Sequence, residues 1–190
     1  MIELVIFDVD GTLAEAYTLN LLPRVKDFFQ LVFQAGCPER PKVALATNQG
    51  GVGMRHWMEK GRFGKPEEYP TREDIEQRLK SLIAKLGGDR SIPVYVSYRY
   101  QTRQGKWAPI PHGEGENPRW QEKWRKPQPG MLLQAMEDAG VAPHRTLFVG
   151  DNRDDQEAAQ AAGCDFQWAS DFFALEWSDC DRLANLVSEN

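Results

Sequence analysis

Apolar residues along the chain fall into two kinds of segment. Short runs rich in β-branched and aromatic residues predict buried strands at residues 2–7, 42–46, 92–96, 146–149 and 164–168. Apolar positions spaced three and four apart predict helices at residues 19–36, 71–87, 129–140 and 155–162. Because strands alternate with helices, the pattern predicts an α/β fold: a parallel sheet covered by helices on both faces, in three layers.

Local signals refine this pattern, and two stretches depart from it. Thr71 and Asp74 resemble a capping box at the start of the second helix, with Asp in place of the usual Glu or Gln. Residues 51–70 and 99–125 are rich in basic and aromatic residues and predict ordered loop insertions. The acidic segment 171–190 predicts a last helix packed on the sheet. We therefore expect one domain over residues 1–190 that carries these two insertions.

Length and composition narrow the class of protein. The chain has 190 residues, of which 41% are hydrophobic and 27% are charged, close to a globular average. No apolar run is long enough to span a bilayer, and no signal peptide is visible. The net charge of −5 argues against a wholesale basic surface for nucleic acid. Three widely spaced cysteines, at positions 37, 164 and 180, favour a reducing, cytoplasmic location.

Polar side chains gather where the predicted strands end. Asp8 and Asp10 follow the first strand, Thr47 and Asn48 follow the second, and Asp151 follows the fourth. Ligands bind outside the carboxyl ends of strands in such sheets. Two neighbouring carboxylates repel unless a proton or a cation holds them, and oxygen ligands without His or Cys favour Mg²⁺. The alternative is that Asp8 and Asp10 only cap a turn; the second Gly-Asp pair after a later strand weighs against it.

Four short motifs resemble those of the haloacid dehalogenase-like (HAD) superfamily. Residues 7–13 read Phe-Asp-Val-Asp-Gly-Thr-Leu, and Thr47-Asn48 follows at the end of the second strand. Lys126 lies within Arg-Lys-Pro-Gln-Pro-Gly-Met, and residues 149–155 read Val-Gly-Asp-Asn-Arg-Asp-Asp. The resemblance implies a Rossmann-like HAD fold. Only residues 14–20 separate the first motif from the first helix, so no large cap domain is expected there, and residues 97–125 could form only a small lid.

The resemblance also implies catalytic roles. Asp8 would be the nucleophile that forms an aspartyl-phosphate, and Asp10 would be the general acid and base. Members that act on carbon–halogen bonds lack the second Asp, so Asp10 implies phosphoryl transfer. Thr47 would hold phosphoryl oxygens together with backbone N–H groups near residues 9, 10 and 48. Lys126 would offset the negative charge shared by the phosphate and Asp8.

A metal site and a substrate rim follow from the same resemblance. Mg²⁺ would be held by Asp8, by the main-chain carbonyl of Asp10 and by Asp151, with Asp155 orienting its water or a neighbouring donor. The structural alternative for Lys126 is a solvated surface lysine, which its Lys-Pro-x-Pro-Gly context disfavours. Substrate contacts are expected from Asn48 of the second motif, from Arg55, and from Arg125, which directly precedes Lys126.

Two phrases, Thr-Asn-Gln-Gly-Gly-Val and Arg-Lys-Pro-Gln-Pro-Gly-Met-Leu, are similar to one HAD subgroup. That subgroup contains heptose-bisphosphate phosphatase, histidinol-phosphate phosphatase and polynucleotide 3′-phosphatase. The first two commonly carry a zinc-binding loop before the third motif. Here residues 99–125 contain no Cys and a single His, His112, so we expect no zinc. The loop instead carries Trp107, Trp120 and Trp124, which either stack on a ligand or pack the loop onto the domain.

Three hypotheses about function follow. The first is a Mg²⁺-dependent phosphomonoesterase that acts on a small phosphorylated metabolite such as a sugar phosphate. The second is a phosphatase for 3′-phosphate ends of nucleic acid, which the basic aromatic loops favour and the net charge disfavours. The third is a non-catalytic phosphate-binding scaffold, which the full set of catalytic residues disfavours. No membrane partner is expected, and the sequence does not indicate an oligomeric state.

Overall fold

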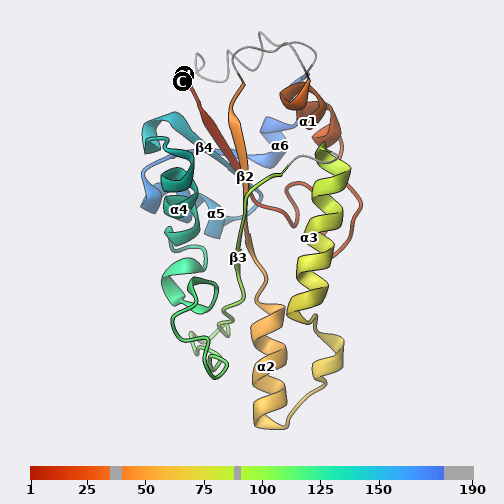
Figure 1. The fold of residues 1–190 in the computed structure, drawn as a ribbon, viewed down its shortest axis with the longest axis vertical. Helices are drawn as coiled ribbons and strands as arrows, with labels where there is room; N and C mark the ends of the chain where they lie inside the picture. Colours follow the sequence, from red (N-terminus) through yellow and green to blue (C-terminus); the bar gives the residue numbers. More distant parts are fainter. Residues whose placement is uncertain (35–39, 88–90, 178–190) are drawn as a thin grey trace.

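In the part of the chain that the structure describes, the sheet has five parallel strands. The computed structural model describes residues 1–34, 40–87 and 91–177. The strands are arranged in the order β3-β2-β1-β4-β5 (Figure 1). Their bounds are β1 Leu4–Phe7, β2 Lys42–Asn48, β3 Val94–Ser97, β4 Thr146–Gly150 and β5 Asp165–Trp168. The α/β prediction is confirmed, and each observed strand lies within three residues of its predicted bounds.

Helices cover both faces of this sheet. Their bounds are α1 Val25–Phe33, α2 Gly51–Gly61, α3 Arg72–Gly87, α4 Gly130–Ala139, α5 Arg153–Ala162 and α6 Ala169–Phe172. Helices α1, α3 and α6 lie on one face, and α4 and α5 lie on the other (Figure 1). No helix of the described residues is long and apolar enough to cross a membrane.

The central strand β1 is buried on both faces. Val5 and Phe7 point into the core under α1, α3 and α6, whereas Leu4 and Ile6 point toward α4 and α5. The Phe7 ring lies 5.5 Å from the ring of Phe172, in an edge-to-face arrangement. Burial on both faces explains why β1 reads as an unbroken apolar run, and this packing holds the strand that delivers Asp8 to the end of the sheet.

The first predicted helix, at residues 19–36, is wrong at its start. Helix α1 begins only at Val25, after Pro23 and after Arg24, whose φ of 62° is left-handed. Leu21 and Leu22 pack against the core from a loop, so their spacing imitates a helical face without forming one. Gly36, the predicted stop, lies outside the described residues, as does most of the predicted C-terminal helix at 171–190.

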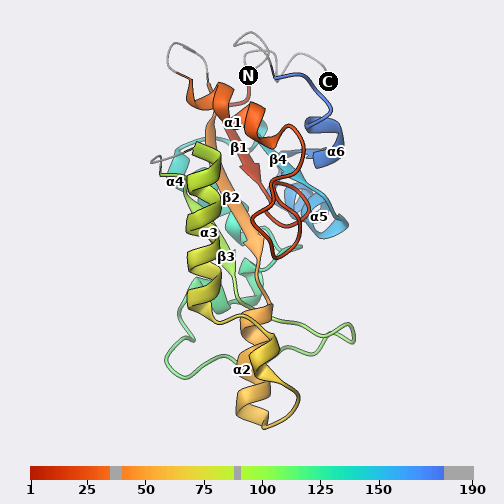
Figure 2. The ribbon, with the colours of Figure 1, turned by 90° about the vertical axis from the view of Figure 1, so that its right-hand side faces the viewer.

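The predicted loop at residues 51–70 is also wrong, because most of it is helix α2 followed by a 3₁₀ turn at Pro66–Glu68. Only Val52, Gly53 and Met58 of α2 are buried, so the helix has a weak apolar stripe. By contrast, residues 99–125 form a loop whose short turns are 3₁₀ helices at Pro118–Trp120 and Glu122–Trp124. Figure 2 shows this loop beside α2, at the end of the molecule reached by the carboxyl ends of β2 and β3.

The predicted cap of the following helix is confirmed. The Asp74 carboxylate accepts a hydrogen bond from the backbone N–H of Thr71 at 2.8 Å. In return, the backbone N–H of Asp74 donates to the Thr71 hydroxyl at 3.1 Å. Because both partners are satisfied, Asp replaces Glu in this capping box without loss of its geometry.

Candidate active site

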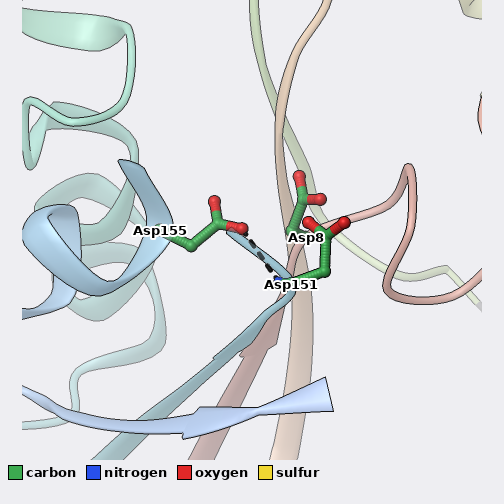
Figure 3. A group of neighbouring side chains, drawn as sticks. All are labelled: Asp8, Asp151 and Asp155. Atoms are coloured by element: carbon green, nitrogen blue, oxygen red, sulfur yellow. Dashed lines mark hydrogen bonds between the residues drawn. The ribbon is translucent and has the colours of Figure 1, made fainter. Parts of the chain in front are cut away.

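Three carboxylates meet at the carboxyl ends of two neighbouring strands. Asp8 follows β1, Asp151 follows β4, and Asp155 lies in the first turn of α5 (Figure 3). One carboxylate oxygen from each lies within 4.8 Å of the others. Asp8 and Asp155 are buried, whereas Asp151 is exposed. The group therefore opens to solvent on the Asp151 side.

The start of α5 places Asp155 and Asp151. The Asn152 side chain accepts a hydrogen bond from the Asp155 N–H, and the Asp155 carboxylate accepts one from the Asn152 N–H. Asp155 Oδ2 also accepts from the Asp151 N–H at 3.2 Å. A Cβ at Gly150 would come within 2.5 Å of that same oxygen. A residue without a side chain at position 150 is thus required for the Asp155 carboxylate to reach the strand end.

A buried lysine joins two of these carboxylates. Lys126 Nζ lies 2.6 Å from Asp8 Oδ1 and 2.6 Å from Asp155 Oδ1. It also donates to the Ala46 carbonyl at 2.9 Å, and only 2% of its side chain is exposed. The Asn48 side chain holds the backbone of Lys126 through two hydrogen bonds, of 2.9 and 3.1 Å. The solvated-lysine alternative is therefore wrong, and the end of β2 positions the lysine.

Burial governs the ionisation of this group. It raises the pKa of Asp8 to about 7; Lys126 acts in the opposite direction, and Asp155 raises that pKa further. Burial disfavours the charge of Lys126, but Asp8 and Asp155 outweigh it and raise the lysine's pKa. Burial also raises the pKa of Asp151. Three carboxylates with one lysine leave excess negative charge, and their oxygen donors suit Mg²⁺.

Asp10 belongs to a separate set of contacts. Its Oδ1 accepts from the Tyr17 N–H at 2.9 Å and from Arg78 Nη2 at 2.5 Å. Its Oδ2 accepts from Gln49 Nε2 at 2.6 Å and from Arg78 Nη1 at 3.3 Å. Gln49 Nε2 also donates to the buried hydroxyl of Thr47 at 2.9 Å. The amide of Gln49 thus connects the predicted acid–base residue to the predicted phosphate-binding hydroxyl.

Gln49 and Arg78 were not predicted. Gln49 directly follows Thr47-Asn48, and this position is the signal that could have identified it. Arg78 lies in α3, 68 residues from Asp10, and nothing local to its sequence indicates the contact.

The two arginines that were predicted to contact the substrate, Arg55 and Arg125, make different contacts. Arg55 donates to Glu59 and to the carbonyls of Pro66 and Tyr69, so its guanidinium holds the turn after α2. These bonds do not include any other predicted site residue, and the structure does not bring Arg55 to the carboxylate group.

Arg125, next to Lys126, donates to the Arg99 carbonyl at 3.2 Å. Burial lowers its pKa, while nearby Asp154 and two tyrosines act in the opposite direction.

The tryptophans of residues 99–125 mainly pack the loop. Trp120 and Trp124 are buried, and the Trp124 indole N–H donates to the Val96 carbonyl at 3.0 Å. Trp107 lies under the Arg99 guanidinium, 5.1 Å from ring centre to carbon. The packing alternative is therefore correct for Trp120 and Trp124.

Known proteins resemble this chain in sequence. The model of a protein family described as HAD-hydrolase-like matches residues 123–168, a range that includes Lys126, Asp151 and Asp155. A D-glycero-beta-D-manno-heptose-1,7-bisphosphate 7-phosphatase from Pseudomonas putida is 31% identical over 171 residues, or 85% of this chain and 78% of that protein. The phosphatase of that name from Pseudomonas aeruginosa is 33% identical over 122 residues, or 64% of this chain and 53% of that protein.

The fold also resembles a solved structure. D,D-heptose 1,7-bisphosphate phosphatase from B. bronchiseptica, in a complex with magnesium and phosphate, aligns over the full length of both chains. The TM-score is 0.55 and the sequence identity is 22%, so this likeness supports the fold alone.

Proposed function

The chain belongs to the HAD superfamily of phosphatases, in the subgroup of the heptose-bisphosphate phosphatases, and from this we propose that it is a magnesium-dependent phosphomonoesterase acting on a phosphorylated sugar. The observation that carries the proposal is the position of Lys126, buried between Asp8 and Asp155 and beside Asp151. A buried lysine next to a carboxylate at the end of a strand suits a phosphate-binding site, because its positive charge offsets the repulsion between the phosphate and that carboxylate.

Asp8 acts as the nucleophile in this proposal. One of its carboxylate oxygens forms a bond to phosphorus while the bond from phosphorus to the leaving oxygen breaks, and the proton of Asp10 passes to that oxygen. Asp10 then takes a proton from water, which attacks the phosphorus, and the bond to Asp8 breaks. Inorganic phosphate and the free carboxylate of Asp8 remain, so atoms and charges balance over the two steps.

The nucleophile must be ionised, although burial raises the pKa of Asp8 to about 7. Lys126 favours the ionised form from 2.6 Å. When bound, Mg²⁺ would supply positive charge in addition to that of Lys126, which would favour the ionised carboxylate and offset the charge of the phosphoryl oxygens. The carboxylates of Asp8 and Asp151, with the main-chain carbonyl of Asp10, would hold it.

Asp155 has a supporting part. Its two oxygens already contact Lys126 Nζ and the N–H groups at the start of α5. We therefore assign it to the orientation of Lys126 and of the strand end that carries Asp151. Thr47 and the neighbouring backbone N–H groups would hold phosphoryl oxygens.

The substrate class rests on the relatives, whose names specify a heptose bisphosphate. A sugar phosphate is favoured over the end of a nucleic acid for this reason. Arg125, next to Lys126, remains a candidate for substrate contact. Arg55 does not, because its guanidinium is hydrogen-bonded to the carbonyls of the turn after α2.

Phosphate release from a panel of substrates tests the proposal. The panel contains sugar monophosphates, sugar bisphosphates, nucleotides and a 3′-phosphorylated oligonucleotide, each with Mg²⁺ or with EDTA, and Asp8→Asn serves as the blank. We expect Mg²⁺-dependent release from a sugar phosphate and none from Asp8→Asn. Preference for the oligonucleotide would contradict the substrate class, and activity in EDTA would contradict the role of the metal.

A further inference from the structure

The Asp10 carboxylate is surrounded by donors before any substrate arrives. A carboxylate offers about four lone-pair positions. Here all four receive a hydrogen bond: two from Arg78 and one each from Gln49 and the Tyr17 N–H. The side chains of Arg78 and Asp10 are 11% and 20% exposed, so water competes little for these contacts. The protein itself therefore sets the orientation of this carboxylate.

Arg78 is the charged member of this set and comes from a different layer of the fold. Its helix, α3, packs on the face of the sheet occupied by α1. Besides its two bonds to Asp10, its Nε donates to the Thr18 carbonyl at 3.1 Å. The planar guanidinium presents its donors in a rigid fork, so one side chain fixes Asp10 and the loop at residues 14–20 relative to each other.

A second residue of α3, Lys85, also contacts this loop but makes no bond to Asp10 among the described residues. Lys85 lies seven residues after Arg78, about two helical turns away. Its Nζ donates to the Leu19 carbonyl at 3.0 Å, in the loop that Arg78 holds. No bond between Lys85 and Asp10 is present among the described residues. Arg78 and Lys85 are thus a matched pair for an experiment. Both side chains donate to carbonyls of the loop at residues 14–20, and of the two only Arg78 also donates to the Asp10 carboxylate.

The proton that Asp10 delivers must take the place of one of these four donors, and the longest bond, from Arg78 Nη1 to Oδ2 at 3.3 Å, is the one that yields. We propose that Arg78 is a positioning residue for the general acid: its bond from Nη2 to Oδ1 holds the Asp10 carboxyl where Oδ2 can deliver the proton to the leaving oxygen. The inference rests on the proposed phosphatase function. General acid catalysis contributes about 10²–10⁴-fold when the leaving group needs a proton and little when it does not. Loss of Arg78 should therefore slow only the substrates that need the proton.

The test compares two substrates through kcat/KM. This quantity covers only the steps up to formation of the aspartyl-phosphate, so the later use of Asp10 as a base does not enter. A sugar phosphate leaves as an alkoxide and needs a proton, whereas p-nitrophenyl phosphate has a stable leaving anion. For Arg78→Gln we expect kcat/KM to fall about tenfold or more with the sugar phosphate and less than about threefold with p-nitrophenyl phosphate.

Two further variants make the result specific. Lys85→Met removes an anchor of the loop without touching Asp10, and we expect less than about threefold change with either substrate. Arg78→Lys keeps the positive charge but loses the forked guanidinium. The ratio of its kcat/KM values for the two substrates should therefore lie between that of wild type and that of Arg78→Gln. Should Arg78→Gln fail to fold, as judged by circular dichroism, Arg78→Lys is assessed by the same ratio.

The contradicting outcomes are distinct. Equal loss with both substrates, or the same selective loss in Lys85→Met, would mean that Arg78 acts only through the fold or the loop. An unchanged ratio in the Arg78 variants, with an active wild type, would overturn the inference alone. A wild type that releases phosphate from neither substrate would overturn the proposed function and this inference together.

Discussion

Replacement of Lys126 by Met should destabilise the protein strongly in the absence of metal. The lysine side chain is 2% exposed and lies between Asp8 and Asp155, whose side chains are 6% and 0% exposed. Methionine fills a similar volume but leaves two buried carboxylates without a counter-charge. Removal of one partner from a buried ion pair costs about 3–5 kcal/mol, and here one nitrogen serves two carboxylates. We expect a loss in this range at pH 8, which increases as the pH rises past about 7, where Asp8 ionises.

Urea unfolding in EDTA, followed by tryptophan fluorescence, measures this loss. Lys123→Met is the matched control, because Lys123 is exposed three residues earlier, and its change should stay within about 0.5 kcal/mol. Mg²⁺ should restore part of the stability of Lys126→Met by supplying positive charge to the same carboxylates. A loss below about 1 kcal/mol at pH 8 would refute the reasoning, since the carboxylates would then not depend on the lysine.

Three other changes test neighbouring parts of the site. Because the folded pKa of Asp8 is about 7 and its ordinary value is 3.8, its contribution to stability is complete below pH 3.8 and is lost as the pH rises to about 7. In EDTA, wild type should therefore lose stability relative to Asp8→Asn across this window, by a few kcal/mol at most; a difference that is independent of pH would argue against the raised pKa. Gly11→Ala should weaken Mg²⁺ binding about tenfold or more in calorimetry, because Gly11 has a φ of +85° and a Cβ there would lie 1.9 Å from Asp151 Oδ2; unchanged affinity would contradict this placement. Asn48→Ala should cost about 1–3 kcal/mol and lower kcat, because the backbone of Lys126 loses two hydrogen bonds; full activity would show that the lysine needs no such support.

The sheet and the cluster at its end could be predicted because their signals are local. Strand β1 is buried on both faces, so residues 4–7 read as an apolar run followed at once by Asp8. Carboxyl ends of parallel strands meet at one edge, so Asp8 and Asp151 could be expected together, 143 residues apart in the sequence.

The rest depended on contacts that no local pattern records. Helix α2 was missed because it buries few residues and has no continuous apolar stripe. Arg55 looked like a rim residue in an open loop, whereas the helix turns its guanidinium toward the Pro66–Tyr69 turn. The bond from Arg78 to Asp10 joins α3 to the loop after β1, and an arginine on a helix has no pattern that distinguishes it from a solvated one.

Chemical trapping of the phosphorylated enzyme tests the assignment of Asp8 most directly. Asp10→Asn should form the aspartyl-phosphate from p-nitrophenyl phosphate, whose leaving group needs no proton, but should hydrolyse it slowly because the base is missing. After acid quench and peptide mapping by mass spectrometry, we expect the phosphoryl group on Asp8, and none in Asp8→Asn. A phosphoryl group on another residue, or phosphate release by an enzyme that carries none at any time, would contradict Asp8 as the nucleophile.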